Sequence, residues 1–255
     1  MNNFVPFLFQ PDFQAMNWQV RLPMNEKLFV RDPEQSELGQ NIVRRGALLM
    51  DKVGFDAFTF KKLAAELNTA EASVYRYFEN KHRLLTYLVA WYWSWLEYRV
   101  VFGTNNLADP AAQLKVVVRL IGGGETPADA SGDMDLRALH RVVIREAAKA
   151  YHTSHVTEDN KAQLFKPYKD LCARIADIIK AHNPKYPFTR SLASTLLETA
   201  HDQTYFMTNL PSLTDFPKSS TQEPVVAFLE HLLFNAIGTH TAAKRECAAP
   251  RKRAA

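Results

Sequence analysis

The sequence predicts an all-α fold, with a small unit of three helices followed by a larger helical body, about nine helices in total. Three observations favour this prediction. Glycine is scarce, with 9 of 255 residues. Few stretches alternate apolar and polar residues with the period of two that marks a β-strand. Apolar residues recur instead at three- and four-residue spacing between recognisable helix starts and stops.

The composition is that of a folded protein, with 47% hydrophobic and 23% charged residues. The net charge of +4 is local, because the stretch 241–255 holds five basic residues against one acidic residue. The rest of the chain is therefore neutral, and its basic pI is no independent indication of nucleic acid. We expect this tail to be disordered and solvated.

Few features of the sequence indicate the cellular compartment. Cys172 and Cys247 lie far apart and form no disulfide framework, which fits a reducing cytoplasm. The longest apolar stretch, 84–102, contains Glu97 and Arg99 and is not a convincing membrane span. The first residues carry no pattern typical of a targeting segment.

The chain is expected to begin with an arm over 1–31, in which 17–32 could form an extended segment or a hairpin. The first helix should then start at Asp32, a natural N-cap, with Pro33 in the first helical position. Gly54 should end it in a left-handed conformation.

Two short helices are predicted next. Thr59 can cap a helix over 60–67, and Asn68 can end it, because Asn is the commonest substitute for Gly at positive φ. After a short turn comes "ASVYRYF", a further helix. This spacing is typical of a helix-turn-helix, whose second helix enters the DNA major groove. The domain would span 32–80.

A larger helical domain is expected over 81–240. Asn80 caps a long helix over about 81–102. The glycine-rich stretch 122–132 predicts a flexible loop. Five further helix starts are marked by Asp109-Pro110, Asp133, Thr157 with Glu158, Pro187, and Glu223-Pro224.

The alternation of aromatic and polar residues in "ASVYRYF" needs an explanation. Val74 and Phe78 share one helical face and can fill the core, whereas Tyr75 and Tyr77 cannot both be core residues. A tyrosine at the rim of a groove can pack its ring on the protein and point its hydroxyl at a phosphate oxygen. Lys81 could reach the same DNA backbone.

The stretch "GFDAFTFKKLAAELNTAEASVYRYFENKHRLL", 54–85, resembles the DNA-binding segment of the TetR family of transcriptional regulators. The shared positions are Gly54-Phe55, Thr59, Leu63-Ala64, Ser73, Tyr75-Arg76-Tyr77-Phe78 and Lys81. The resemblance implies that phosphates are held by Thr59, Tyr75, Tyr77 and Lys81. It implies that Ser73 and its neighbours, Arg76 among them, face the bases.

The segment also departs from the family pattern. Glu71 stands where the family often has Lys or Arg, and a carboxylate is unfavourable near DNA unless it accepts a hydrogen bond from cytosine. Lys61, Lys62 and either Arg44 or Arg45 could supply further phosphate contacts. Glu71 is also the main argument for the alternative function, a helical interaction protein that kept the fold but lost sequence-specific DNA binding.

The resemblance further implies that the larger domain binds a small ligand and forms a homodimer through its last two long helices. Here these would be 187–210 and 224–240. The second carries a broad apolar stripe that must pack on the body's own core or on a partner in a four-helix interface. The stripe comprises Val225, Phe228, Leu229, Leu232, Leu233 and Ile237.

Aromatic residues and isolated polar groups are the candidates for the ligand site, although each could instead be a core or surface residue. Glu146 is a further polar group to inspect. The candidates are Trp91, Trp95, His140, Tyr168, His201 and Tyr205. They imply an unknown small hydrophobic ligand, with aromatic character.

No enzyme motif is recognisable, neither a nucleophile elbow nor a phosphate-binding loop. His152 and His155 have helical spacing, but no third ligand for zinc is fixed by the spacing. No catalysis, metal or cofactor is therefore expected. The leading interpretation is a cytoplasmic, ligand-responsive repressor that binds a double-stranded DNA operator as a dimer and is released by its ligand.

Overall fold

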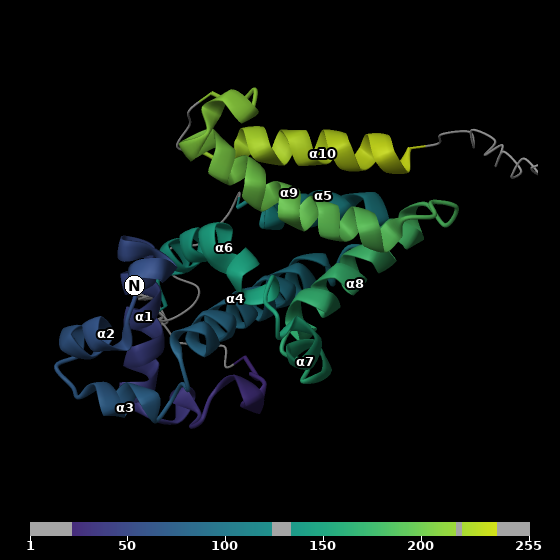
Figure 1. Ribbon diagram of the computed structural model, residues 1–255. Helices are drawn as coiled ribbons and strands as arrows, with labels where there is room; N and C mark the ends of the chain where they lie inside the picture. Colours follow the sequence, from purple (N-terminus) through teal and green to yellow (C-terminus); the bar gives the residue numbers. More distant parts are fainter. Residues whose placement is uncertain (1–21, 124–133, 218–220, 239–255) are drawn as a thin grey trace, which may run out of the picture.

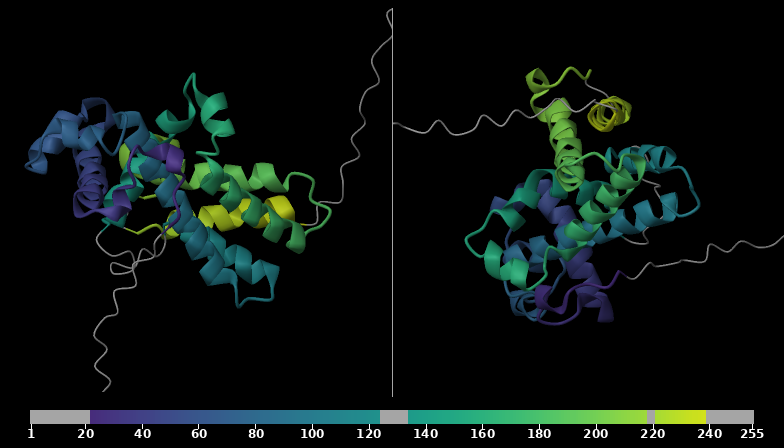
Figure 2. Two further views of the ribbon diagram at one scale, coloured as in Figure 1. Left: turned by 90° about the horizontal axis from the view of Figure 1, so that it is seen from below. Right: turned by 90° about the vertical axis from the view of Figure 1, so that its right-hand side faces the viewer.

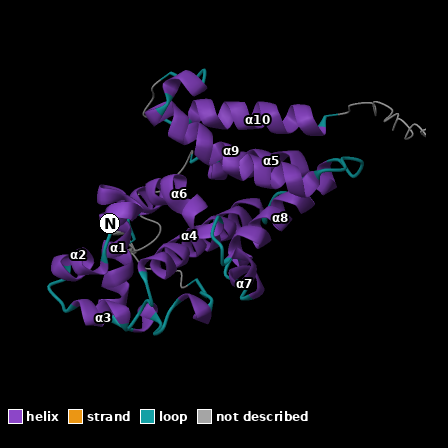
Figure 3. Ribbon diagram, viewed as in Figure 1, coloured by secondary structure: helices purple, strands orange, loops and turns teal. Residues whose placement is uncertain are grey.

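The computed structural model describes residues 22–123, 134–217 and 221–238. Within these ranges the chain forms ten α-helices and three short 3₁₀-helices, with no strand (Figure 3). The all-α prediction is confirmed. The hairpin considered for residues 17–32 is a wrong prediction for residues 22–32, the part that the structure describes. There the chain forms a 3₁₀ turn over Glu26–Leu28 and no strand. The rest of the arm, most of the glycine-rich stretch and the basic tail lie outside the described residues.

The N-terminal domain consists of α1 (Glu37–Ala57), α2 (Phe60–Glu66) and α3 (Glu71–Tyr75), which lie together at one end of the molecule (Figures 1 and 2). The predicted start of the first helix at Asp32 is wrong by a few residues. Asp32 caps a separate 3₁₀ turn by accepting a hydrogen bond from the Glu34 N–H, 2.9 Å away. Ser36 is extended and caps α1 itself, with its Oγ 3.1 Å from the Gly39 nitrogen.

Gly54 has the expected positive φ of 76°, but its ψ is 159°, and it kinks α1 rather than ending it, since the helix continues to Ala57. The other local signals of this domain are confirmed. Thr59 caps α2 by accepting from the Lys62 N–H at 3.2 Å. Asn68 has a φ of 49° and allows the sharp turn into α3. Asn80 caps the next helix by accepting from the Arg83 N–H at 2.9 Å.

The larger domain is built around α4 (Lys81–Thr104), whose side chains are buried along most of its length. It packs against α5 (Pro110–Ile121), α6 (Leu136–Tyr151) and α8 (Lys166–His182). Next to α8 lies α9 (Thr189–Asn209), and α10 (Glu223–Ile237) covers α9 and α5. The two views in Figure 2 place α10 on the side of the molecule away from the N-terminal domain. α4 thus joins the two parts directly, and α6 packs on α1.

The tenth helix arises from a break that the sequence does not mark. One helix was expected from Thr157 onward, but α7 (Val156–Lys161) ends early and α8 begins afresh at Lys166. Gln163 lies between them with a φ of 62°, which turns the chain. Because Gln is not a usual residue at positive φ, this break carried no recognisable signal.

Candidate DNA interface and candidate ligand cluster

α3 presents one face to the core and the other to solvent. Val74 and Phe78 are fully buried, as the spacing predicted. Glu71 and Arg76 are exposed. Ser73 is partly buried, and its Oγ accepts a hydrogen bond from the Arg76 guanidinium at 3.1 Å. The exposed face therefore offers one cation, one carboxylate and a hydroxyl.

The two tyrosines of this segment differ in their surroundings. Tyr75 is 49% exposed, and its ring packs edge-on against Phe60 with centroids 5.0 Å apart. Tyr77 is 3% exposed, and its hydroxyl is hydrogen-bonded to Ser36 Oγ at 2.8 Å. Tyr75 thus has the geometry expected of a residue at the rim of a groove. A phosphate contact by Tyr77 does not fit its burial, because the side chain belongs to the core and supports the cap of α1.

α1 and α2 carry further cationic side chains at the surface. Lys61 and Lys62 are exposed, and Lys62 Nζ donates to the Ala57 carbonyl at 2.7 Å. Arg45 is exposed on α1, while Arg44 is partly buried and lies 3.4 Å from Gln40 Oε1. Thr59 is also exposed beside them. None of these five side chains is fully buried.

Lys81 is placed differently from the expectation. Its Nζ donates to the carbonyls of Phe55, Asp56 and Phe58 at 3.0, 3.1 and 3.2 Å. An ammonium group has three protons to donate, so these carbonyls use its full capacity. A phosphate contact by Lys81 would require it to give up part of this arrangement.

The larger domain gathers an aromatic cluster around Tyr92 and Trp93 of α4. His140 of α6 stacks on Tyr92 with centroids 5.6 Å apart, and His201 of α9 stacks on Trp93 at 5.1 Å. The two imidazoles are 5.9 Å apart. Tyr168 of α8 completes the cluster 4.8 Å from Trp93. Four helices therefore converge on one aromatic cluster.

The structure brings together part of the predicted ligand set. His140, Tyr168 and His201 lie in the cluster, and Trp95 adjoins it 5.9 Å from Tyr92. Trp91 is buried elsewhere on α4, and the ring partner of Tyr205 is its neighbour Phe206. The central rings, Tyr92 and Trp93, belong to the same "AWYWSWLEY" run, but the periodicity alone did not show which of its rings face α6 and α9.

Burial sets the charge state of the cluster. It lowers the pKa of His140 to about 4, with a smaller contribution from Arg141, and that of His201 to about 3, with a smaller contribution from His140. Both rings are therefore neutral near pH 7, and each can donate one hydrogen bond and accept another. Burial also raises the pKa of Tyr168, whose hydroxyl donates to Glu198 Oε1 at 2.6 Å. The cluster is aromatic, polar at its nitrogens, and uncharged.

Little space is left beside Trp93 on the side of the cluster that faces Tyr151 and Tyr168. A cavity of about 10 Å³, room for about one water molecule, lies between Trp93, Tyr151, Phe165 and Tyr168. Two of these lining residues are bonded to each other, because Trp93 Nε1 donates to the Tyr151 hydroxyl. A ligand of ordinary size requires ~300 Å³ or more, so it would have to part these rings.

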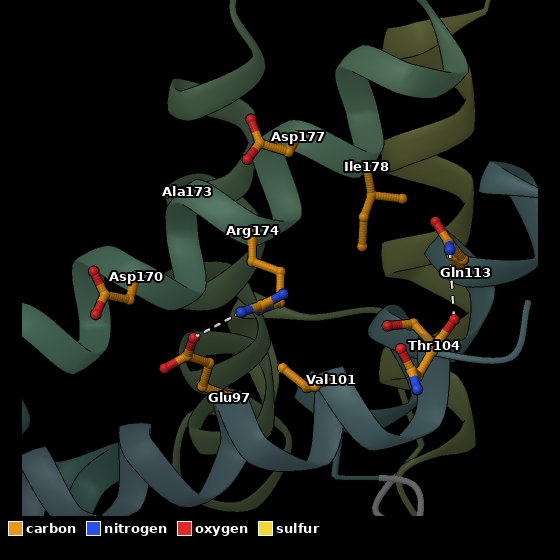
Figure 4. A pocket seen from close by; sticks show the side chains of 10 residues that line it. Glu97, Val101, Thr104, Gln113, Asp170, Ala173, Arg174, Asp177 and Ile178 are labelled. Carbon is orange, nitrogen blue, oxygen red and sulfur yellow. Dashed lines mark hydrogen bonds and ion pairs between the residues drawn. The ribbon is translucent and has the colours of Figure 1, made fainter. Parts of the chain in front are cut away.

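A second concavity lies on the outside of the domain, between the end of α4 and α8 (Figure 4). It is an open groove of about 560 Å³ with polar walls, in which Arg174 pairs with Glu97 at 3.2 Å and Gln113 donates to the Thr104 carbonyl at 3.4 Å. Asp170 and Asp177 lie at its rim. Its polarity differs from the hydrophobic site that the sequence indicated.

The described residues contain no group of three or more His, Cys, Asp or Glu side chains that could hold a metal ion. No helix among them is long and apolar enough to cross a membrane.

Comparison with known proteins is consistent with this architecture. Residues 42–88, from the second turn of α1 to the first turns of α4, match the family model described as bacterial regulatory proteins, tetR family. No curated protein matches the chain. Several solved structures share its fold at low sequence identity.

One is a bacterial regulatory protein of the tetR family from Rhodococcus RHA1, with 15% identity, a TM-score of 0.58, and coverage of 80% of this chain and 98% of that one. AibR, in complex with isovaleryl coenzyme A and operator DNA, has 15% identity, a TM-score of 0.55, and coverage of 76% and 97%. The fatty acid degradation regulator FadR from Bacillus halodurans has 16% identity, a TM-score of 0.54, and coverage of 79% and 95%. Residues 42–88 thus match the tetR family of bacterial regulatory proteins, and the chain shares its helical fold with these solved structures.

Proposed function

We propose that the protein is a ligand-responsive transcriptional regulator that represses by binding operator DNA. The observation that supports this most is α3. Val74 of α3 and Phe78, just beyond it, are anchored in the core, while Tyr75 and the C-cap residue Arg76 are exposed, and α1 and α2 carry further exposed cations. Such a helix can enter a major groove with its exposed face while the helices behind it hold the phosphates.

The proposed interface assigns roles by exposure. Thr59, Lys61 and Tyr75, with Arg44 or Arg45, would contact phosphates. Ser73 and Arg76 would face base edges. We leave Tyr77 and Lys81 out of the interface, because the first is buried and the second is bonded to three carbonyls.

We propose a homodimer formed through α9 and α10. On α10, a second apolar line of Phe228, Leu232 and Ala236 runs beside the fully buried positions and is only partly covered by the chain's own residues. Packing it against its copy would form a four-helix interface. A dimer also suits paired half-sites on DNA, which need two recognition helices at a fixed separation.

The proposed ligand is a small hydrophobic molecule that enters the cluster of Tyr92, Trp93, His140 and His201. The neutral imidazoles favour an uncharged group that exchanges hydrogen bonds with them. AibR is named as a complex with an acyl coenzyme A and FadR as a fatty acid degradation regulator, so acyl thioesters are reasonable first probes. A ligand lowers DNA affinity only if it binds the DNA-free arrangement better than the DNA-bound one.

The test is fluorescence anisotropy of the purified protein with labelled DNA from its own upstream region, compared with scrambled DNA, at two salt concentrations. The proposal expects tighter binding to the upstream DNA that weakens steeply with salt, because phosphate contacts release counterions. Arg76→Ala should lose the preference for the upstream sequence. Equal, weak binding to both DNAs that disappears when residues 241–255 are removed would place the attraction in the tail and contradict the proposal.

The alternative, an interaction protein that no longer reads DNA, rests on Glu71, which is exposed on the helix that would enter the groove. Glu71→Lys separates the two. If α3 docks in a groove, this change should strengthen binding by removing a repulsive charge. If α3 does not dock, the anisotropy should be unchanged.

A further inference from the structure

The corner between α1 and α2, residues 54–59, is hydrogen-bonded to both α6 and α4. Its turn begins at Gly54, and the next residue, Phe55, has both backbone groups bonded to other helices. The Phe55 N–H donates to Glu146 Oε1 of α6 at 3.0 Å. The Phe55 carbonyl accepts from Lys81 Nζ of α4 at 3.0 Å. One residue of the N-terminal domain is thus tied to both helices that border it.

The side chain of Phe55 is held in the same way. Lys81 Nζ lies 4.6 Å from the centre of its ring, and Lys149 Nζ of α6 lies 5.6 Å from it. Ammonium groups are attracted to the face of an aromatic ring. The ring therefore lies near two cations, one from each neighbouring helix.

Charge pairs fix α6 onto this corner. Glu146 is 7% exposed and pairs with Lys149 at 3.0 Å, and Lys149 also reaches the Asp56 carboxylate at 2.8 Å. A buried carboxylate needs its partners, because an unpaired buried charge is strongly unfavourable. Lys149 is therefore the cation that both satisfies Glu146 and joins α6 to the corner.

Two more cations on the same face of α6 form ion pairs with α1. Arg141 and Arg145 both pair with Asp51, at 2.7 and 2.6 Å. Arg141, Arg145 and Lys149 follow each other at four-residue spacing and thus line one face of the helix. His140, the residue before Arg141, belongs to the aromatic cluster. A single helix therefore contacts the candidate ligand cluster and the N-terminal domain.

We propose that Glu146, Lys149 and Lys81 form a joint around Phe55 that fixes the orientation of the N-terminal domain on α6 and α4, and that Lys81 acts in this joint rather than on a DNA phosphate. These three are positioning residues, because they act on α2 and α3 only through the corner they hold. Only the second part of the test below rests on the proposed function.

The first part needs no DNA. Hydrogen–deuterium exchange of the full chain, read by mass spectrometry, compares wild type with Lys149→Met, Lys149→Arg and the control Lys115→Met, which changes an exposed lysine on α5. For Lys149→Met we expect about tenfold faster exchange in peptides from α2 and α3, with α8 and α9 within about twofold of wild type. Lys149→Arg, which keeps the charge, should restore most of the protection, and Lys115→Met should match wild type.

Uniformly faster exchange throughout Lys149→Met would show a general loss of stability and overturn the joint, and so would unchanged exchange in α2 and α3. If Lys149→Met does not fold, Asp56→Asn gives a milder test, because it removes the more exposed end of the pair, whose side chain is 87% exposed. It should speed exchange by about threefold in the same peptides and nowhere else.

The second part separates the two roles of Lys81 in DNA binding. Losing a phosphate contact lowers the slope of log affinity against log salt by about 0.9. Lys81→Met should weaken binding and leave this slope unchanged, whereas Lys61→Met should reduce it. A reduced slope for Lys81→Met would overturn its place in the joint. If wild type binds no DNA, the proposed function fails, while the exchange experiment still decides on the joint.

Discussion

The buried imidazoles of His140 and His201 make the stability of the larger domain sensitive to acid. Burial lowers their pKa values to about 4 and about 3, whereas in the unfolded chain they titrate near 6.5. Between these values the unfolded chain binds protons that the folded chain excludes. Stability therefore rises with pH in this window. The full contribution is present above about pH 6.5 and is lost progressively as the pH falls toward 4 and 3.

The size of the effect follows from these values. At pH 5 an unfolded imidazole is almost fully protonated and a folded one is mostly neutral. Because pH 5 lies about 1.5 units below the unfolded pKa, each ring destabilises the folded state by about 2 kcal/mol at this pH. The pair should thus remove about 4 kcal/mol from the free energy of unfolding between pH 8 and pH 5. That is a large share of the stability of an ordinary domain.

Urea unfolding at pH 8, 6.5 and 5, followed by far-UV circular dichroism, measures this loss. The double variant His140→Phe/His201→Phe keeps two aromatic rings in the core but removes the titrating groups, so it should lose about 4 kcal/mol less than wild type over the same range. His155→Asn, which replaces a histidine whose side chain is 79% exposed, should behave like wild type. An equal loss in wild type and in the double variant would refute the argument.

Three further changes test local features of the N-terminal domain. Tyr77→Phe should lower the free energy of unfolding by about 1 kcal/mol through the lost bond to Ser36, with little effect on DNA affinity; a large loss of affinity at unchanged stability would mean that the hydroxyl does reach a phosphate. Gly54→Ala should lower the free energy of unfolding by about 1–3 kcal/mol, measured by thermal or urea unfolding, because only glycine easily adopts a φ of 76° with a ψ of 159°. An unchanged free energy of unfolding would show that the turn relaxes to accommodate alanine. Asn68→Val should cost about 1–2 kcal/mol at a φ of 49°, while Asn68→Gly should stay within about 0.5 kcal/mol of wild type; similar values for both would argue against the left-handed turn.

Features that depend on neighbouring residues could be predicted from the sequence. Thr59 and Asn80 cap their helices as expected, since a cap bonds to a nitrogen only three residues away. The start of α1 was misplaced because Asp32 and Ser36 are both good caps, and both are used. The turn at Gln163 carried no signal, because tertiary packing alone decides that a glutamine takes a positive φ there.

Features that depend on distant residues could be predicted only in part. The alternation of aromatic and polar residues over 72–78 showed that Tyr75 and Tyr77 cannot both be core residues. Which of the two is buried depends on Ser36, 41 residues earlier than Tyr77. Glu146 stood out as an isolated polar group on an apolar helix face, yet its partner, the Phe55 N–H, lies 91 residues away. The four-residue spacing of cations on α6 was visible in the sequence, whereas the carboxylates that they meet were not.

The filled space beside Trp93 also has a consequence for kinetics. The rings of Trp93, Tyr151 and Tyr168 leave about 10 Å³ between them, which is too little for a ligand of ordinary size to enter between these rings as they stand. If the proposed ligand enters between these rings, its entry must wait for a rearrangement of the helices around them, a motion of microseconds to milliseconds. Association would then level off at high ligand concentration, and its plateau would report how often the protein opens rather than how often the two molecules collide.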